Sequence, residues 1–280
     1  MTALPAFEMK RPAPRRNGGR AGLLGTMVRT DVRAGLRSPE FAVGVIAVPV
    51  LLYTMFGLPS ASSLLPGGTR VGAMMLVSLT SYGIVSLAIF TFGDEVAKER
   101  GRGWPRTLQA TPLPLWVYLG GKLAMAVIYA GLITAAMSLV AATAGGVSLP
   151  IGTWLELSAT MLAGVVAFST LGFAIAYLAR PRTATVIANL LFLPLAFLSG
   201  FFFPLSQLPA ILRDVAPWLP TYHFGQLAWH RVAPTADVEA FTGIASPGQG
   251  THLAWLLGSA AVFAATALIA ARREGVTRRG

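Results

Sequence analysis

Residues 71–92 read VGAMMLVSLTSYGIVSLAIFTF and contain no Asp, Glu, Lys, Arg or His. An uncharged apolar stretch of about this length is typical of a helix that crosses the hydrocarbon core of a bilayer. Five further stretches share the property and lie at Phe41–Leu58, Leu123–Ala144, Leu157–Leu178, Thr183–Phe203 and Leu253–Ala271. We therefore expect an all-α integral membrane protein with six transmembrane helices.

The composition of the whole chain argues against a water-soluble protein. Of the 280 residues, 54% are hydrophobic and 12% are charged, whereas a soluble domain carries about 25% charge. The chain has no Cys, which excludes disulfides and thiolate chemistry. The six segments leave only short connections, so we expect one transmembrane domain over 21–280, preceded by a disordered basic tail over 1–20.

The Lys and Arg residues fall almost entirely on one side of the expected membrane. Nineteen of the 22 lie before the first span, between spans two and three, between spans four and five, or after the last span. The positive-inside rule therefore predicts that both termini are cytoplasmic. The preference for Arg over Lys and the abundance of Ala and Gly are common in GC-rich bacteria. We expect a multi-pass protein of a bacterial plasma membrane.

The segment before the first span has a helical pattern of its own. An apolar row at Leu24, Val28, Val32 and Leu36 runs beside a basic row at Arg29, Arg33 and Arg37. This spacing predicts an interfacial helix whose arginines reach lipid phosphates. A basic flank that is helical without lying in the interface is the alternative.

No catalytic, nucleotide or metal site is expected in this chain. Gly120-Gly121-Lys122 lacks the upstream glycine and the following Ser or Thr of a phosphate-binding loop. The three His residues lie on the expected outer side without carboxylates at ligand spacing. An ion-coupled carrier generally holds an ionisable residue inside the bilayer, and these spans hold only mild polar groups. Energy for transport is therefore expected from a partner.

The longest cytoplasmic loop is expected at 93–118. It starts with mixed charges, breaks at Gly101–Gly103, and continues with Pro105, which suits a first helical position. A residue before proline avoids the helical region, so Thr111-Pro112 ends any helix there. A short helix over 106–110 would suit the groove of another protein, and a solvated loop without a partner is the alternative.

These residues carry a resemblance to a known family. Glu99-Arg100-x-x-Gly103, Thr111-Pro112 and Gly121-Lys122-Leu123 resemble the ABC-2 type ABC transporter permeases. The run from Ser199 to Leu205, with Leu208-Pro209 and Trp218-Leu219-Pro220 after it, is similar to the segment that precedes the last span in that family. One departure is Gly103-Trp104-Pro105-Arg106, where many relatives have Gly-Thr-Leu-Glu, so that a basic residue replaces an acidic one.

The resemblance implies a cytoplasmic coupling helix, and an external re-entrant helical hairpin before the last span. It implies the membrane subunit of an ATP-driven exporter, an efflux protein that pairs in the lipid bilayer with a second copy of itself or a similar permease. A separate ATPase subunit would bind ATP and Mg and dock on loop 93–118. This chain would then hold no cofactor, bind no nucleic acid and catalyse no reaction itself.

The residues implied by the resemblance form two groups. Coupling to the ATPase is expected at Glu95, Glu99, Arg100, Gly103, Trp104, Arg106, Leu108, Thr111 and Pro112. An external gate or aromatic anchor is expected at Ser199, Gly200, Phe201, Phe202, Phe203, Pro204, Leu205 and Pro209. The alternatives are a non-transporting scaffold or regulatory subunit of a signalling complex and, third, a secondary carrier. The apolar spans suit a hydrophobic or amphipathic cargo.

Overall fold

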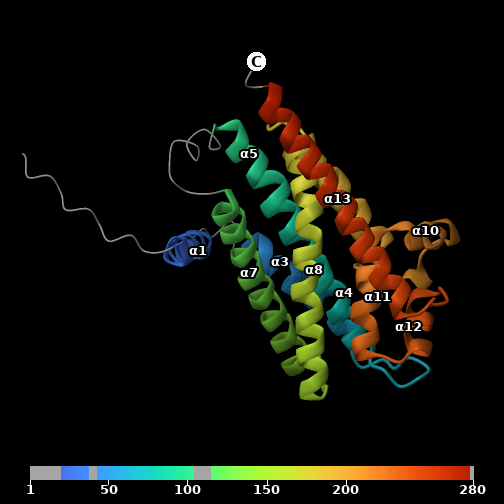
Figure 1. The fold of residues 1–280 in the computed structure, drawn as a ribbon. Helices are drawn as coiled ribbons and strands as arrows, with labels where there is room; N and C mark the ends of the chain where they lie inside the picture. The colour runs from blue at the N-terminus through green and yellow to red at the C-terminus, as the bar shows by residue number, and fades with distance from the viewer. Residues whose placement is uncertain (1–19, 38–42, 104–114, 278–280) are drawn as a thin grey trace, which may run out of the picture.

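The structure, a computed structural model, describes residues 20–37, 43–103 and 115–277. The predicted tail over 1–20 therefore lies almost wholly outside the described residues. Within these ranges the chain folds into helices joined by turns, with one isolated β-bridge between Leu64 and Arg70. The all-α prediction is confirmed, and Figure 1 shows the long helices running side by side.

The elements follow the apolar pattern of the sequence closely. They are α1 (Arg20–Arg37), η1 (Val43–Ala47), α3 (Val48–Leu52), η2 (Tyr53–Gly57), η3 (Leu58–Ser60), α4 (Val71–Ala88), η4 (Ile89–Glu95), α5 (Val96–Gly101), α7 (Leu115–Thr143), α8 (Ile151–Leu178), α9 (Ala184–Leu198), η5 (Leu205–Gln207), α10 (Ala210–Val215), η6 (Ala216–Trp218), α11 (Pro220–Val232), α12 (Thr235–Thr242) and α13 (Gln249–Thr277). The elements η1, η2 and η4 are π-helical, and η3, η5 and η6 are short 3₁₀ turns.

Five helical segments are long and apolar enough to cross a membrane: Val43–Ser60, Val71–Gly101, Val117–Thr143, Ile151–Leu178 and Gln249–Arg273. The sixth expected span, Thr183–Phe203, is helical only over Ala184–Leu198. Its 15 residues make a helix about 22 Å long, against the ~30 Å of a hydrocarbon core. Pro194 lies inside this helix. The count of six full spans is thus confirmed for five segments and not for α9.

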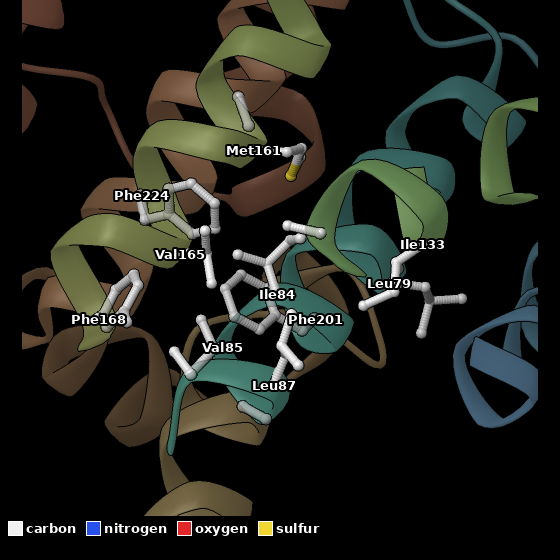
Figure 2. Packing of buried hydrophobic residues seen from close by; sticks show 14 of the residues in the cluster. Leu79, Ile84, Val85, Leu87, Ile133, Met161, Val165, Phe168, Phe201 and Phe224 are labelled. Carbon is white, nitrogen blue, oxygen red and sulfur yellow. The ribbon is translucent and has the colours of Figure 1, made fainter. Parts of the chain in front are cut away.

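The helix α4 lies at the centre of the bundle. Its span is 83% buried within the protein, against 11% for α13 and 17% for the first span. Figure 2 shows α4 residues Leu79, Ile84 and Val85 packed against α7, α8, α11 and Phe201. A helix that is apolar on every side is typical of a buried position. The outward-facing apolar residues of α13 and the first span are left for lipid.

The mild polar residues of the core bond to their own helices. The hydroxyls of Ser78, Thr80 and Thr134 donate to the carbonyl oxygens of Met74, Leu76 and Ala130, at 3.0, 2.6 and 2.8 Å. The backbone of the same helix thus accepts the proton of each of these hydroxyls.

The predicted helix before the first span is confirmed as α1, which packs against α7. The Tyr129 hydroxyl donates to the Val32 carbonyl at 2.9 Å, and Met27 lies against Gly121. The side chains of Arg29, Arg33 and Arg37 are exposed, as the basic row predicts. The position of α1 at the membrane interface stays a prediction.

Two loop boundaries predicted from the sequence are wrong. The expected loop at 93–118 starts later, because the helical path of α4 continues through η4 and α5 to Gly101. It also ends earlier, because α7 begins at Leu115, so that Gly120-Gly121-Lys122 lies within a helix. The helix α5 extends past the apolar run with mostly polar residues, whereas α7 begins with the apolar Leu115-Trp116-Val117, which the single charge of Lys122 separates from the run at Leu123.

The end of the molecule opposite α5, here called the far end, is held by one buried carboxylate. Asp237 of α12 is fully buried and accepts hydrogen bonds from the backbone N–H groups of Gly67, at 2.5 Å, and Thr69, at 2.9 Å. Burial alone raises the pKa of Asp237, but the hydrogen bonds from Thr69 and Gly67 hold this pKa below the ordinary value. The turn between the first span and α4 is thereby fixed to α12.

Replacing Asp237 with Asn should lower the free energy of unfolding by about 1.5–3 kcal/mol, because the amide keeps one acceptor and turns its NH₂ toward the other N–H donor. Thermal unfolding of the purified protein in detergent should show a lower Tm. Asp214→Asn removes the same charge from an exposed residue of α10 and should leave the Tm within error. Equal Tm values for the two variants would contradict this role of Asp237.

Candidate functional site

Charged residues gather where α5 leaves the apolar part of the bundle, which we call the charged end. The continuous helix η4–α5 carries Asp94, Glu95, Lys98, Glu99 and Arg100 within two turns, immediately after the uncharged α4. Figure 1 places α5 at the same end of the molecule as the C-terminal part of α13. The helix therefore ends in a cluster that can pair with the three neighbouring helices.

The first polar contact of this cluster joins α5 to α7. Lys122 Nζ lies 2.8 Å from Glu99 Oε1, and the Tyr118 hydroxyl donates to the other carboxylate oxygen of Glu99. Lys122 is only 6% exposed, so its ammonium group depends on this carboxylate. Because Glu99 precedes 104–114 in the sequence and Lys122 follows it, the pair joins the helices on either side of these residues.

Two further polar contacts join the helix η4–α5 to α8 and α9. The Asp94 carboxylate accepts from Thr185 of α9 at 2.6 Å and pairs with Lys98 at 2.7 Å. Arg100 donates to the Ala176 carbonyl of α8, and its guanidinium lies 4.6 Å from the centre of the Tyr177 ring. The continuous helix η4–α5 is therefore in direct polar contact with α7, α8 and α9.

The structure describes four of the predicted coupling residues and does not describe the other five. Glu95, Glu99 and Arg100 lie on the helix, and Gly103 closes its end with a φ of +80°, a conformation that favours glycine. Trp104, Arg106, Leu108, Thr111 and Pro112 lie outside the described residues. Sequence reasoning missed Asp94, Tyr118, Lys122 and Thr185 as partners, although Asp94 and Lys122 are charges next to apolar spans.

The second predicted group lies where α9 ends. Gly200 has a φ of +77°, and a Cβ there would come within 2.7 Å of the Leu205 side chain. The chain turns back at this glycine. Phe201 then enters the main core (Figure 2), and Leu205 joins a small cluster with Ala216 and Tyr222.

The three phenylalanines of this turn have different surroundings. Phe201 and Phe202 are buried, and Phe202 packs edge-on against Tyr82 of α4 with 5.0 Å between ring centroids. Phe203 is the exposed ring, and it contacts Phe56 of η2 with ring centroids 5.4 Å apart. Two of the rings therefore hold the turn against the bundle, and Phe203 alone faces outward.

The prolines after the turn divide the chain into short helices, as the sequence predicts. Pro204 precedes η5, Pro209 precedes α10, and Pro220 begins α11. The Ser199 and Thr221 hydroxyls lie 2.6 Å apart, so they bond the end of α9 to the start of α11. The helix α11 then packs against α4, where Trp229 Nε1 donates to Ser78 Oγ at 3.1 Å. The result is a compact helical unit of α10, α11 and α12 beside α13 (Figure 1), here called the far lobe.

Comparison with known proteins identifies relatives over most of the chain. The family model described as ABC-2 type transporter matches residues 23–228. The chain is 29% identical over 203 residues to the "Putative transport permease YvfS" of Bacillus subtilis, covering 72% of this chain and 82% of that protein. It is 34% identical to Nodulation protein J of Sinorhizobium fredii and 31% identical to that of Rhizobium leguminosarum bv. trifolii, each over 65% of this chain and 70% of the relative.

Glu99→Ala should lower the free energy of unfolding by about 3–5 kcal/mol, because it leaves the Lys122 ammonium buried without its carboxylate. The double variant Glu99→Ala/Lys122→Met should recover most of this loss, as measured by denaturation in detergent. Lys98→Met breaks an ion pair whose Lys side chain is 46% exposed and should cost about 0–1 kcal/mol. Additive effects in the double variant would show that Glu99 and Lys122 do not act as a pair.

Proposed function

Because this chain belongs to the ABC-2 type transporter family, we propose that it exports its substrate with energy taken from a separate ATPase subunit. The family makes the chain the membrane subunit of an ABC transporter, a multi-pass membrane protein that works with an ATP-binding subunit. The direction of transport, the docking site and the stoichiometry are our proposal. Two copies of the chain, or this chain with a similar permease, would pair and dock two ATPases.

The observation that carries the proposal is the ion pair between the helix before residues 104–114 and the helix after them. The Glu99–Lys122 pair at 2.8 Å joins the helices on either side of this segment, and Arg100 and Asp94 continue the connection to α8 and α9. A partner that binds the segment therefore acts on four helices at once. An effector shifts a conformational equilibrium only by binding its states unequally. ATP binding and hydrolysis in the partner would supply that difference.

In this proposal, ATP is bound and hydrolysed in the partner subunit and not in this chain. ATP and Mg would bind to the ATPase subunit, and this chain would bind the substrate and change its accessibility. The charged end would face the cytoplasm, in agreement with the Lys and Arg distribution, and the far lobe would face the exterior of a bacterial cell. In this orientation the turn at Ser199–Leu205 lies at the outer mouth, where it would act as a gate or anchor.

The direct test is to isolate tagged protein from its native membranes in a mild detergent and to assay the eluate for ATP hydrolysis. We expect an ATPase subunit in a stoichiometric amount, with activity that depends on Mg. Crosslinking in intact membranes before extraction is the control, because detergent can separate subunits. If neither procedure recovers an ATPase, the scaffold interpretation replaces this one.

Leu108→Asp should reduce transport at least about tenfold, because a charge on the apolar contact of the expected coupling helix opposes docking in an apolar groove. Membrane insertion should be unchanged, as measured by the amount of protein in the membrane fraction. Gln109→Asp places the same charge at the neighbouring position and keeps Leu108, so it should retain most of the transport. Normal transport and ATP hydrolysis with Leu108→Asp would remove Leu108 from the coupling site.

A further inference from the structure

The three His residues of the chain lie together where α11 of the far lobe packs against the start of α13, although they are separated in the sequence. His223 and His230 belong to α11, and His252 belongs to the first turn of α13. His223 is 2% exposed and His252 is 0% exposed. Their Nδ1 atoms are 2.7 Å apart, so the two rings form a direct hydrogen bond between α11 and α13.

The other two ring nitrogens of this pair are also occupied. His223 Nε2 lies 2.9 Å from the Pro217 carbonyl oxygen, and His252 Nε2 lies 3.0 Å from Ser246 Oγ. A carbonyl oxygen can only accept, so His223 Nε2 carries the proton and His223 Nδ1 is the acceptor. His252 Nδ1 then donates to it, and Ser246 donates to His252 Nε2. One arrangement of protons thus satisfies every ring nitrogen with both rings neutral.

Protonation of the pair has a geometric limit. One added proton can be accommodated, because His252 can change tautomer, donate to Ser246 Oγ and accept from His223 at Nδ1. A second proton places N–H groups on both Nδ1 atoms, 2.7 Å apart, and two like charges in a buried site. The direct contact between α11 and α13 cannot survive the doubly charged state.

In the part of the chain that the structure describes, no carboxylate is hydrogen-bonded to either ring of the pair. On α13, Trp255 stacks on His223 with 4.9 Å between ring centroids and 12° between planes. On α11, Tyr222 packs edge-on against both rings, and His230 lies 6.2 Å from His252 between centroids. Glu239 of α12 accepts from the Ser246 backbone N–H at 2.9 Å, and Ser246 Oγ in turn bonds to His252, so this carboxylate is connected to the pair through Ser246.

We propose that His223 and His252 form a proton-operated latch, which holds α11 against α13 while the rings are neutral and opens when both are protonated. In the orientation of the proposed function, on which this assignment of side rests, the latch responds to acidity outside the cell. Acidification would loosen the far lobe, to which the turn at Ser199–Leu205 is bonded through Thr221. The latch would therefore control the mobility of the turn at Ser199–Leu205.

The sign of the pH dependence follows from the burial of His223. Desolvation lowers the pKa of His223, although its hydrogen bond to the Pro217 carbonyl acts in the opposite direction. The unfolded chain then binds more protons than the folded chain below the ordinary histidine pKa of about 6.5. The stabilisation by the latch is complete above that pH and is lost as the pH falls below it.

The first test uses the purified full chain with ¹⁵N-labelled histidine, in which only these three residues give signals. At about pH 7.5, above the ordinary histidine pKa, His223 should be unprotonated at Nδ1 and His252 at Nε2. On acidification these two rings should take up protons together, with His223 doing so below its ordinary pKa, and amide hydrogen exchange in α11 and the start of α13 should rise in parallel. Protonation of His223 and His252 independently of each other, with unchanged exchange, would overturn the latch.

The second test compares variants by the fall in Tm between about pH 7.5 and about pH 5, on either side of the ordinary histidine pKa. His223→Gln/His252→Gln keeps groups that donate and accept but removes the titrating rings, so the acid-induced fall should be at least roughly halved. His230→Gln is the matched control and should keep the wild-type fall, because His230 Nδ1 bonds to the Gln226 carbonyl of its own helix at 2.8 Å. An unchanged fall in the double variant would refute the latch, and neither test depends on an ATPase.

Discussion

The enclosure of α4 by its neighbours is the constraint on which the rest of the structure depends. A helix buried on every side cannot carry a charge without a partner, so the chain from Val71 to Phe92 is uncharged throughout. The hydroxyls of Ser78 and Thr80 donate to the backbone of their own helix, and Ser78 Oγ also accepts from Trp229 of α11. The first charges of this path, beginning at Asp94, therefore all occur at one end, where they pair with α7, α8 and α9.

The sequence predicted the helices well because apolar length is a local property. Each of the six apolar stretches contains a helix, although Thr183–Phe203 is helical only over Ala184–Leu198, and Pro204, Pro209 and Pro220 begin or precede new elements. Hydropathy did not predict the helix ends. Asp94 and Lys98 are four residues apart and pair on the helix surface, so the polar continuation past Phe92 is stabilised within the helix rather than released as a loop.

The side-chain pairs at the two ends of the bundle could not be predicted from the sequence. Lys122 meets Glu99 across a separation of 23 residues, and His252 meets His223 across 29. Neither separation corresponds to a helical repeat or a known ligand spacing. Both depend on how α7 and α13 pack against their neighbours, which hydropathy leaves undetermined because each helix is apolar over much of its surface. The family resemblance identified the segments but not these contacts.

The central path also connects the two ends mechanically. Ser78 of α4 contacts Trp229 of the far lobe, and Glu99 of α5 contacts Lys122 at the charged end. Ser78 and Glu99 are 21 positions apart on one uninterrupted helical path, a rise of about 31 Å, and this path is regular except at η4. A π-helical segment has a looser hydrogen-bond pattern than the α-helix and commonly marks functional positions. A displacement applied at α5 therefore reaches α11 without crossing a flexible loop, and η4 is the place where that path can bend.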